Sequence, residues 1–292
     1  MNKRYFFGLV AIFAVLAACA FDNNVNAQNI RRCSTNNSNN LLIIGLTADQ
    51  RLVCFREVNP GRASVIGPVT GLSGDSALIG IDYRVQDGQL YGVGNAGGVY
   101  RIDTGSGAAT FVNNLTVALD GTSFGVDFNP AADRLRIISN TGQNLRHNVN
   151  LGGVTINDGT LTYTAPPASP VAALGVTGAA YTNNDLDAST ATTLFDIDST
   201  MNQVVIQSPA NNGLLAATGK LGVDTSDVVG FDIYSTLQGA ITVDNEGFAV
   251  LTSAEGISLF YSVSLLTGRA TLIGGFGVGI QIVDIAIPLN QR

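Results

Sequence analysis

Residues 78–83 read Leu-Ile-Gly-Ile-Asp-Tyr, an apolar stretch interrupted by one glycine and one aspartate. Its Gly-x-Asp triplet recurs complete at Gly125-Val126-Asp127 and Gly230-Phe231-Asp232. Gly178-Ala179-Ala180 keeps only the Gly, and Ile282-Val283-Asp284 keeps only the Asp. The third positions of these triplets are 82, 127, 180, 232 and 284, so the steps between them are 45, 53, 52 and 52 residues. A nearly constant period of this length indicates one repeated supersecondary unit.

Pairs of short strands follow the triplets. After the first triplet come Leu90–Val93 and Val99–Asp103, then a turn at Thr104–Gly107 and a further strand at Ala108–Val112. Alternating apolar and polar residues bounded by Gly, Asn and Asp are the signals of antiparallel hairpins. Comparable pairs follow other repeats at Leu145–Ile156, Leu194–Ile206 and Leu259–Ile273. Each unit therefore predicts four short antiparallel strands in about 50 residues, which is the size of a propeller blade.

The two ends of the chain complete the repeat. The hairpin strands between Leu41 and Ile66 have no Gly-x-Asp strand before them, and Ile282–Pro288 has no hairpin after it. We expect these segments to share one blade, so that the C-terminal strand closes the ring against the N-terminal strands and leaves no open sheet edge. The predicted fold class is therefore all-β and β-propeller-like, with five blades of four antiparallel strands.

The spacing inside the repeats is uneven. Tyr261 follows the triplet aspartate Asp232 by 29 residues, whereas Tyr100 follows the triplet aspartate Asp82 by only 18. The first step of the repeat is also shorter than the others. Two packed sheets or a six-bladed ring therefore remain as alternatives.

The composition agrees with a strand-rich fold. Of the 292 residues, 46% are hydrophobic, which excludes a disordered chain. Only 3 Glu and 2 Lys are present, and these residues are the usual surface of solvated helices. Lys+Arg 15 against Asp+Glu 22 gives a net charge of −7, so nucleic acid is not expected as a partner.

The N-terminus has the composition of an export signal. A positively charged start precedes the uncharged apolar stretch Tyr5–Phe21, and Val25-Asn26-Ala27 is an acceptable cleavage site. Leu16-Ala17-Ala18-Cys19 offers an alternative, since this is the pattern of a bacterial lipobox in which Cys19 is lipidated. We predict a signal peptide over 1–27, or one ending before Cys19. The protein is then exported: secreted, periplasmic or held at the cell envelope by a lipid anchor, which is the only membrane contact expected.

The remaining chain divides into a short polar segment and one domain. Residues 28–40 form the polar segment, and residues 41–292 are predicted to be a single β-propeller-like domain. Cys33 falls in the first and Cys54 in the second. Because an exported chain meets an oxidising compartment, we expect these cysteines to form a structural disulfide. Two unpaired thiols are the alternative.

The repeated aspartates are the first candidate site. Equivalent positions of innermost strands surround the axis of a propeller, which would bring together Asp82, Asp127, Asp232 and Asp284. Carboxylates that converge on a channel can hold a hard cation such as Ca²⁺. Alternatively, each Asp accepts a backbone N–H from the neighbouring blade and holds the ring together. Ala180 at one equivalent position favours the second interpretation, and apart from Ca²⁺ no cofactor is expected.

The densest polar cluster of the chain is the second candidate site. Guanidinium groups recognise carboxylates and phosphates, and side-chain amides both donate and accept hydrogen bonds. A ligand mouth for a sugar or an acidic polymer is therefore predicted from Asp127, Arg134, Arg136, Asn144, Arg146, Tyr181 and Asn183. The alternative is that Asp–Arg pairs fix turns between blades. The expected partner is a small molecule, a glycan or an envelope protein.

His147 is the only histidine. The sequence has no Gly-x-Ser-x-Gly elbow to present a nucleophile to it, which disfavours a Ser-His-Asp hydrolase. A single histidine also excludes the usual His-rich zinc site. We expect His147 at the surface or in a turn.

Several unconnected motifs occur in a fixed order: Gly80–Arg84, Phe128-Asn129-Pro130, Asp133–Arg136, Thr141–Arg146 and Thr193–Asp198. In residues and spacing they resemble the domain of unknown function 4394 family, over roughly Leu42 to Ile287. The resemblance implies an exported bacterial protein with a propeller-like domain, and it implies no particular activity. Tyr83-Arg84-Val85 stands where the family pattern has Phe-Arg-Pro, and Arg146-His147-Asn148-Val149 where it has a Pro near the turn.

These observations favour a binding or scaffold module of the cell envelope, with its ligand unidentified. The alternative is a carbohydrate-active or lactone-hydrolysing enzyme that uses the aspartates of the central channel, with or without a bound cation. One His and 3 Glu limit the usual acid–base pairs, so binding is favoured over catalysis.

Overall fold

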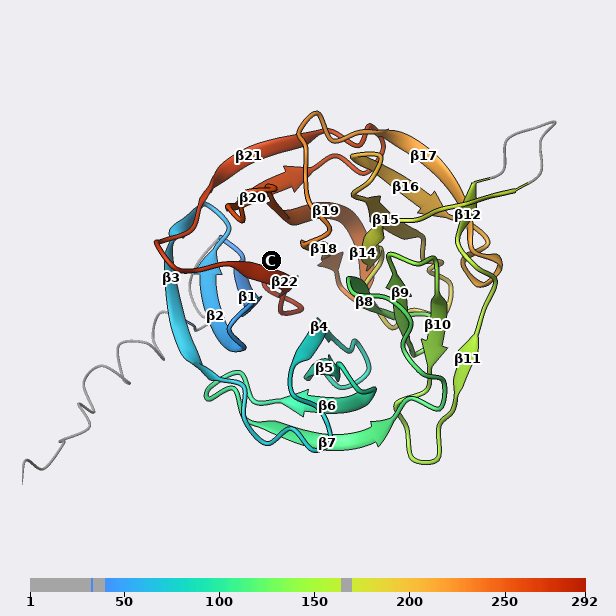
Figure 1. Cartoon of the computed structure of the whole chain (residues 1–292), viewed down its shortest axis with the longest axis horizontal. Coiled ribbons are helices and arrows are strands. Elements are labelled where there is room, and N and C mark those ends of the chain that lie inside the picture. The colour runs from blue at the N-terminus through green and yellow to red at the C-terminus, as the bar shows by residue number, and fades with distance from the viewer. Residues whose placement is uncertain (1–32, 34–39, 164–169) are drawn as a thin grey trace, which may run out of the picture.

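Five antiparallel sheets surround a common axis in the computed structural model, which describes residues 33, 40–163 and 170–292 (Figure 1). Each sheet is one blade, and its strands lie side by side from the axis to the rim. The described residues form strands, turns and one short 3₁₀ helix, Ala210–Asn212. The predicted fold class, an all-β propeller of five blades, is confirmed.

The strands of each blade are given from the axis outward. Blade 1 contains β22 (Ile282–Ala286), β1 (Leu42–Thr47), β2 (Arg51–Arg56) and β3 (Asn59–Pro68). Blade 2 contains β4 (Leu78–Tyr83), β5 (Leu90–Gly94), β6 (Gly98–Ile102) and β7 (Ala109–Asn114). Blade 3 contains β8 (Phe124–Asn129), β9 (Arg134–Ser139), β10 (Asn144–His147) and β11 (Thr155–Asn157). Blade 4 contains β14 (Val176–Tyr181), β15 (Leu194–Asp198), β16 (Gln203–Gln207) and β17 (Leu214–Lys220), then β12 (Thr162–Tyr163) and β13 (Val171–Ala172). Blade 5 contains β18 (Val229–Gln238), β19 (Ile241–Thr252), β20 (Ser258–Val263) and β21 (Ala270–Gly275).

Blade 1 is built from both ends of the described chain. β22 pairs antiparallel with β1, with Ile44 opposite Ala286, and Figure 1 shows this last strand beside the first. Gln291 extends the same edge, because its side chain accepts a hydrogen bond from the Leu42 N–H (2.7 Å) and donates one to the Leu42 carbonyl (2.9 Å). The predicted closure of the ring by the C-terminal strand is therefore confirmed.

The core is divided among the seams between neighbouring blades. Successive residues of a strand point to opposite faces of the sheet, so each blade supplies one apolar row to the seam on either side. Members of the five clusters include Leu46 and Ile81 (blades 1 and 2), Val93 and Leu135 (2 and 3), Ile138 and Val205 (3 and 4), Ile197 and Phe231 (4 and 5), and Phe55 and Phe260 (5 and 1). Burial of one such side chain contributes about 1.5–3 kcal/mol, so stability depends on every seam being closed.

Three blades depart from the predicted pattern of four equal strands. The sheet of blade 4 has six strands, because β12 pairs in parallel with β17 and antiparallel with β13. β11 of blade 3 has only 3 residues, and the chain that follows it is used on the rim of blade 4. In blade 5, β18 and β19 have 10 and 12 residues and pair as far as Gln238 and Ile241. The uneven spacing in the sequence thus marks a long hairpin rather than a sixth blade.

Cys33 and Cys54 form the predicted disulfide, with 5.6 Å between their Cα atoms. Cys54 lies on β2, so the bond ties Cys33 to blade 1. The predicted signal peptide, both cleavage sites and Cys19 lie outside the described residues. Within the described ranges, no helix has the length and apolar character needed to cross a bilayer.

Replacing Gln291 with Ala is expected to lower the free energy of unfolding by about 1–3 kcal/mol, because the N–H of buried Leu42 loses its acceptor. Gln291→Glu retains the acceptor oxygen but replaces the N–H donor that faces the carbonyl oxygens of Leu42 and Pro288 with a second oxygen, so it should also be destabilised. Equilibrium denaturation of the three proteins measures the difference. Parent-like stability of Gln291→Ala would contradict a role for this residue in ring closure.

Candidate functional site

Four aspartates on innermost strands reach the backbone of a neighbouring blade. Asp82 accepts a hydrogen bond from the N–H of Phe128 (2.7 Å), Asp127 from Tyr181 (3.1 Å), Asp232 from Ile287 (2.6 Å) and Asp284 from Ile81 (2.8 Å). These bonds join blade 2 to 3, 3 to 4, 5 to 1 and 1 to 2. The sequence offered two roles for the repeated aspartates, a cation site or backbone hydrogen bonds between blades, and these four bonds are of the second kind.

Burial changes the protonation of these axial aspartates. None of the four is more than 6% exposed. Burial raises the pKa of Asp82, Asp127 and Asp284 well above the ordinary range, and nearby carboxylates raise it further. Burial also raises the pKa of Asp232 to about 7, against the opposing effect of the N–H groups of Ile287 and Ile233. The axial carboxyls therefore retain protons through the acidic range.

Three axial aspartates also meet a geometric condition for cation binding. Asp82, Asp127 and Asp232 each offer one oxygen, and these oxygens lie within 4.8 Å of one another. Oxygen-only ligands suit Ca²⁺, which would replace the retained protons as the counter-charge. Asp284 does not belong to this group of three. Calcium binding at the axis stays a prediction.

The seam between blades 4 and 5 is joined differently, because Ala180 occupies the equivalent position on β14. Residues just after β14 supply the contacts: the Asn183 N–H donates to Asn245 Oδ1 (3.0 Å), the Asn184 amide to the Ile233 carbonyl (3.0 Å), and the Thr242 N–H to Asp185 (3.0 Å). Blades 4 and 5 are thus connected through the extended hairpin.

The predicted polar cluster is brought together in the seam between blades 3 and 4. Arg136 on β9 donates hydrogen bonds to the Tyr181 hydroxyl (3.2 Å), Asn144 Oδ1 (2.7 Å), Asp158 (2.8 Å) and Asn211 Oδ1 (2.8 Å). Arg146 shares Asp158 through its Nε (3.0 Å). Arg136 is 2% exposed and Asn144 is 0% exposed, so the guanidinium faces protein acceptors rather than solvent. Asp127 joins this cluster through the Tyr181 backbone.

Two predicted ligand residues lie elsewhere. Asn183 is in the seam between blades 4 and 5, as described above. Arg134 uses Nη1 to donate to the carbonyls of Ala132 (3.2 Å) and Asp133 (2.7 Å). The seven predicted ligand residues are therefore divided among three places rather than gathered at one mouth.

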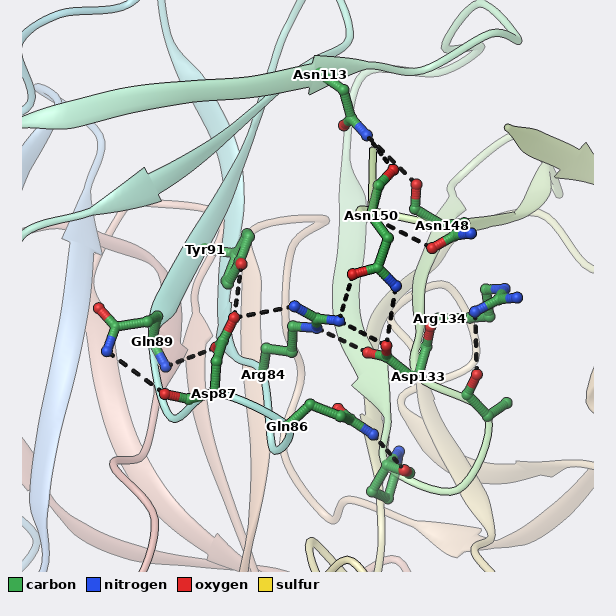
Figure 2. A network of polar contacts seen from close by, with 12 residues as sticks. Arg84, Gln86, Asp87, Gln89, Tyr91, Asn113, Asp133, Arg134, Asn148 and Asn150 are labelled. Carbon is green, nitrogen blue, oxygen red and sulfur yellow. Dashed lines mark hydrogen bonds and ion pairs between the residues drawn. The ribbon is translucent and has the colours of Figure 1, made fainter. Parts of the chain in front are cut away.

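Figure 2 shows the polar network beside Arg134. Arg84 forms a bidentate pair with Asp133, with Nε–Oδ1 at 2.7 Å and Nη2–Oδ2 at 2.6 Å, and it also donates to Asp87 (3.0 Å) and Asn150 (2.9 Å). The pair connects the loop after β4 with the loop after β8. This network is a second polar link between blades 2 and 3, in addition to the bond between Asp82 and Phe128.

His147 contradicts the expectation of a surface or turn position. It is the last residue of β10 and is 0% exposed. Its Nδ1 pairs with Thr155 Oγ1 and its Nε2 with Asn113 Oδ1, each at 3.0 Å. Burial, together with the charge of Arg134, lowers the pKa of His147 to about 4. The residue faces blade 2 like Leu145, because alternate strand residues share a face.

A cleft of about 1170 Å³ lies beside the β18–β19 hairpin and was not predicted from the sequence. Its walls come from β19, the β20–β21 turn, the β2–β3 turn and the segment after β14, so three blades contribute. β18 ends at Gln238, five residues past Ile233, which is the equivalent of the last residue of β4, Tyr83. The uneven 29-residue spacing is the only sequence signal of this extension.

Two of the three glutamates of the chain meet in this cleft. The Arg292 guanidinium pairs with Glu57 (2.5 Å) and with Glu246, and it lies 5.9 Å from the centre of the Tyr234 ring. Burial raises the pKa of Glu246; Arg292 opposes the shift, and the carboxylates of Glu57 and Asp244 add to it. Residues this far apart in sequence cannot be paired by any local pattern.

Comparison with known proteins identifies the family. The family described as "Domain of unknown function (DUF4394)" matches residues 51–286, and the chain belongs to it. Comparison with curated proteins gives no match.

Solved structures resemble the chain only distantly. Hydrazine synthase of Kuenenia stuttgartiensis is 10% identical with a TM-score of 0.40, over 74% of this chain and 52% of that one, so this chain spans about half its length. A protein of unknown function from Bacteroides thetaiotaomicron is 11% identical with a TM-score of 0.45, over 86% and 67%. An auxiliary nutrient binding protein from Bacteroides ovatus is 14% identical with a TM-score of 0.39, over 78% and 57%. At these sequence identities and TM-scores, the similar structures assign no activity to this chain.

Asp232 is expected to make the protein less stable as the pH rises. Because its pKa is raised from 3.8 to about 7, its contribution is complete below about pH 3.8 and is lost as the pH rises to about 7, an effect of about 4 kcal/mol. Asp232→Asn keeps an acceptor for Ile287 and develops no charge, so its unfolding midpoint should vary less between pH 4 and 7. Exposed Asp120→Asn is the control and should follow the parent. A curve for Asp232→Asn that is parallel to the parent curve would contradict this role.

Arg84→Lys is expected to lower the free energy of unfolding by about 1–2 kcal/mol, because an ammonium group cannot make the bidentate pair with Asp133. Arg134→Lys is a matched control from the same network, since Arg134 bonds only to carbonyls of adjacent residues. Chemical denaturation should separate the two variants. Equal losses would show that the bidentate link does not matter.

Proposed function

We propose that this member of the domain of unknown function 4394 family is an exported binding module whose ligand lies in the cleft beside the β18–β19 hairpin. The observation that carries the proposal is the origin of the cleft. It exists because the two innermost strands of blade 5 form an extended hairpin of 10 and 12 residues, whereas the two innermost strands of the other blades have 5 or 6 residues. An extended departure from the repeat is where a scaffold commonly carries its binding surface.

The lining of the cleft favours a glycan as the ligand. Hydroxyl and amide side chains line it, among them Thr182, Thr193, Asn245, Ser262 and Thr271. These groups both donate and accept hydrogen bonds, which matches the hydroxyl groups of a sugar. Exposed charges of both signs and exposed aliphatic side chains complete the surface. A volume of about 1170 Å³ accommodates several sugar units rather than a single one.

Export is part of the proposal and is supported by the disulfide. A bond between Cys33 and Cys54 persists in an oxidising compartment and is rare in the cytosol. The predicted signal or lipobox would place the protein outside the cytoplasm, either free or lipid-anchored. A binding module at that location meets envelope or extracellular polysaccharides.

The enzymatic alternative depends on the axial aspartates rather than on the cleft. Each of them accepts a backbone hydrogen bond within the ring and is almost completely buried. A substrate would need access to carboxyls that hold the blades together. Binding in the cleft needs no such rearrangement, so it is the better supported function.

Binding of glycans to the purified, disulfide-bonded protein tests the proposal. A glycan array should give a ligand, and Asp244→Ala and Arg269→Ala should each weaken its affinity about tenfold, because a charged hydrogen bond contributes about 1.5–3 kcal/mol. Both residues are exposed and line the cleft, so the fold should survive both changes. Isothermal titration measures the affinities.

A matched pair separates cleft binding from general surface effects. Val243 in the cleft and Ile257 in the β19–β20 turn are both 58% exposed. Val243→Ser should weaken glycan binding, whereas Ile257→Ser should not. Equal effects of the two substitutions would refute the cleft assignment. Binding of a metabolite or an envelope protein that the cleft variants leave unchanged would refute it as well.

A further inference from the structure

Blade 4 contains a concentration of buried polar atoms without hydrogen-bond partners. Of seven such side-chain atoms in the described residues, four belong to this blade: Thr177 Oγ1, both carboxyl oxygens of Asp196, and Gln207 Oε1. Asp196 is 0% exposed and Gln207 is 2% exposed. Leaving one such group unpartnered in an apolar interior costs about 1–3 kcal/mol. Natural interiors therefore satisfy buried polar groups, often with ordered water.

Asp196 and Gln207 point from adjacent strands into the same seam. Asp196 on β15 is opposite Val205 on β16, and Leu194 is opposite Gln207. Cross-strand partners and alternate residues share one face of a sheet. Val205 and Leu194 belong to the apolar cluster between blades 3 and 4. The carboxyl of Asp196 and the amide oxygen of Gln207 are therefore diagonal neighbours in that seam, within reach of one small molecule.

Blade 3 supplies a hydrogen-bond donor to this seam. Arg136 extends into it, and its bonds to Tyr181, Asn144, Asp158 and Asn211 engage four of its five N–H groups. Burial raises the pKa of Asp196, and the charge of Arg136 opposes this shift, so the guanidinium acts on the carboxyl electrostatically. The seam thus contains three acceptor oxygens on one side and a cationic donor on the other.

We propose that the seam between blades 3 and 4 is a binding site for one water molecule, which donates hydrogen bonds to Asp196 and Gln207 and accepts one from Arg136. A water molecule fits because it both donates and accepts, and because buried water typically makes about three hydrogen bonds. A metal ion could bind the three oxygens but could not accept a bond from the guanidinium. The water then couples the buried Arg136–Tyr181 cluster to the centre of blade 4.

Two substitutions test the site. Asp196→Leu removes one of the water's two acceptors, the one that carries the carboxyl group, and should lower the melting temperature by about 5 °C or more. Gln207→Met removes the other acceptor and should lower it by a smaller amount. Leu194→Met changes the same face at nearly constant volume and is the control, with little expected effect. An unchanged or higher melting temperature for Asp196→Leu would overturn the proposal, since an unpartnered buried acid is improved by an apolar replacement.

A crystal structure at high resolution supplies a readout that does not depend on folding of a variant. It should show one density peak within about 3.2 Å of Asp196 and Gln207. The absence of a peak there would overturn the proposal. Exchange of Na⁺ for K⁺, and Ca²⁺ added after chelation, should change the melting temperatures of the parent and of Asp196→Leu equally if Asp196 and Gln207 hold water. A cation-specific shift that disappears in Asp196→Leu would identify a metal ion instead.

Discussion

The ring depends on a single repeated contact, in which the aspartate of an innermost strand accepts a backbone N–H from the neighbouring blade. A propeller blade contributes side chains to two seams, yet each ladder of the described strands lies within one sheet. The Asp82–Phe128 and Asp284–Ile81 bonds supply the polar connection that the sheets themselves do not. Their cost is the burial of several carboxyls near one axis, which explains why these groups retain protons and why stability should depend on pH.

The one seam that lacks this contact is also the seam where the fold changes. Ala180 has no side-chain acceptor, and the extended β18–β19 hairpin supplies other contacts to blade 4 through Asn183, Asn184 and Asp185. The same hairpin forms a wall of the cleft. The missing axial bond and the cleft therefore occur in the same pair of blades. The other four seams keep the axial aspartate bond, so the ring holds together although blades 4 and 5 are joined by different contacts.

The polar residues of blade 3 show how far local sequence patterns reach. The density of Arg, Asn and Asp indicated a polar cluster, and Arg136, Asn144 and Arg146 do lie close together, because they are on neighbouring strands of one sheet. The sequence did not reveal that Asp158 and Asn211 close the cluster, since these partners come from outside those strands. His147 was misplaced for a related reason: its two partners lie on β11 and on β7 of the preceding blade.

By itself, the sequence predicted five blades, closure by the C-terminal strand and the Cys33–Cys54 bond, because these follow from period, alternation and cysteine number along the chain. It left a six-bladed ring, two packed sheets and unpaired thiols open as alternatives. Only the tertiary structure decided which polar groups are buried, which aspartates meet at the axis, and that Glu57, Glu246 and Arg292 share one cleft. The physical reason is that strand periodicity is a local property of the chain. Burial and charge pairing depend on which blades become neighbours, and that is settled only when the ring closes.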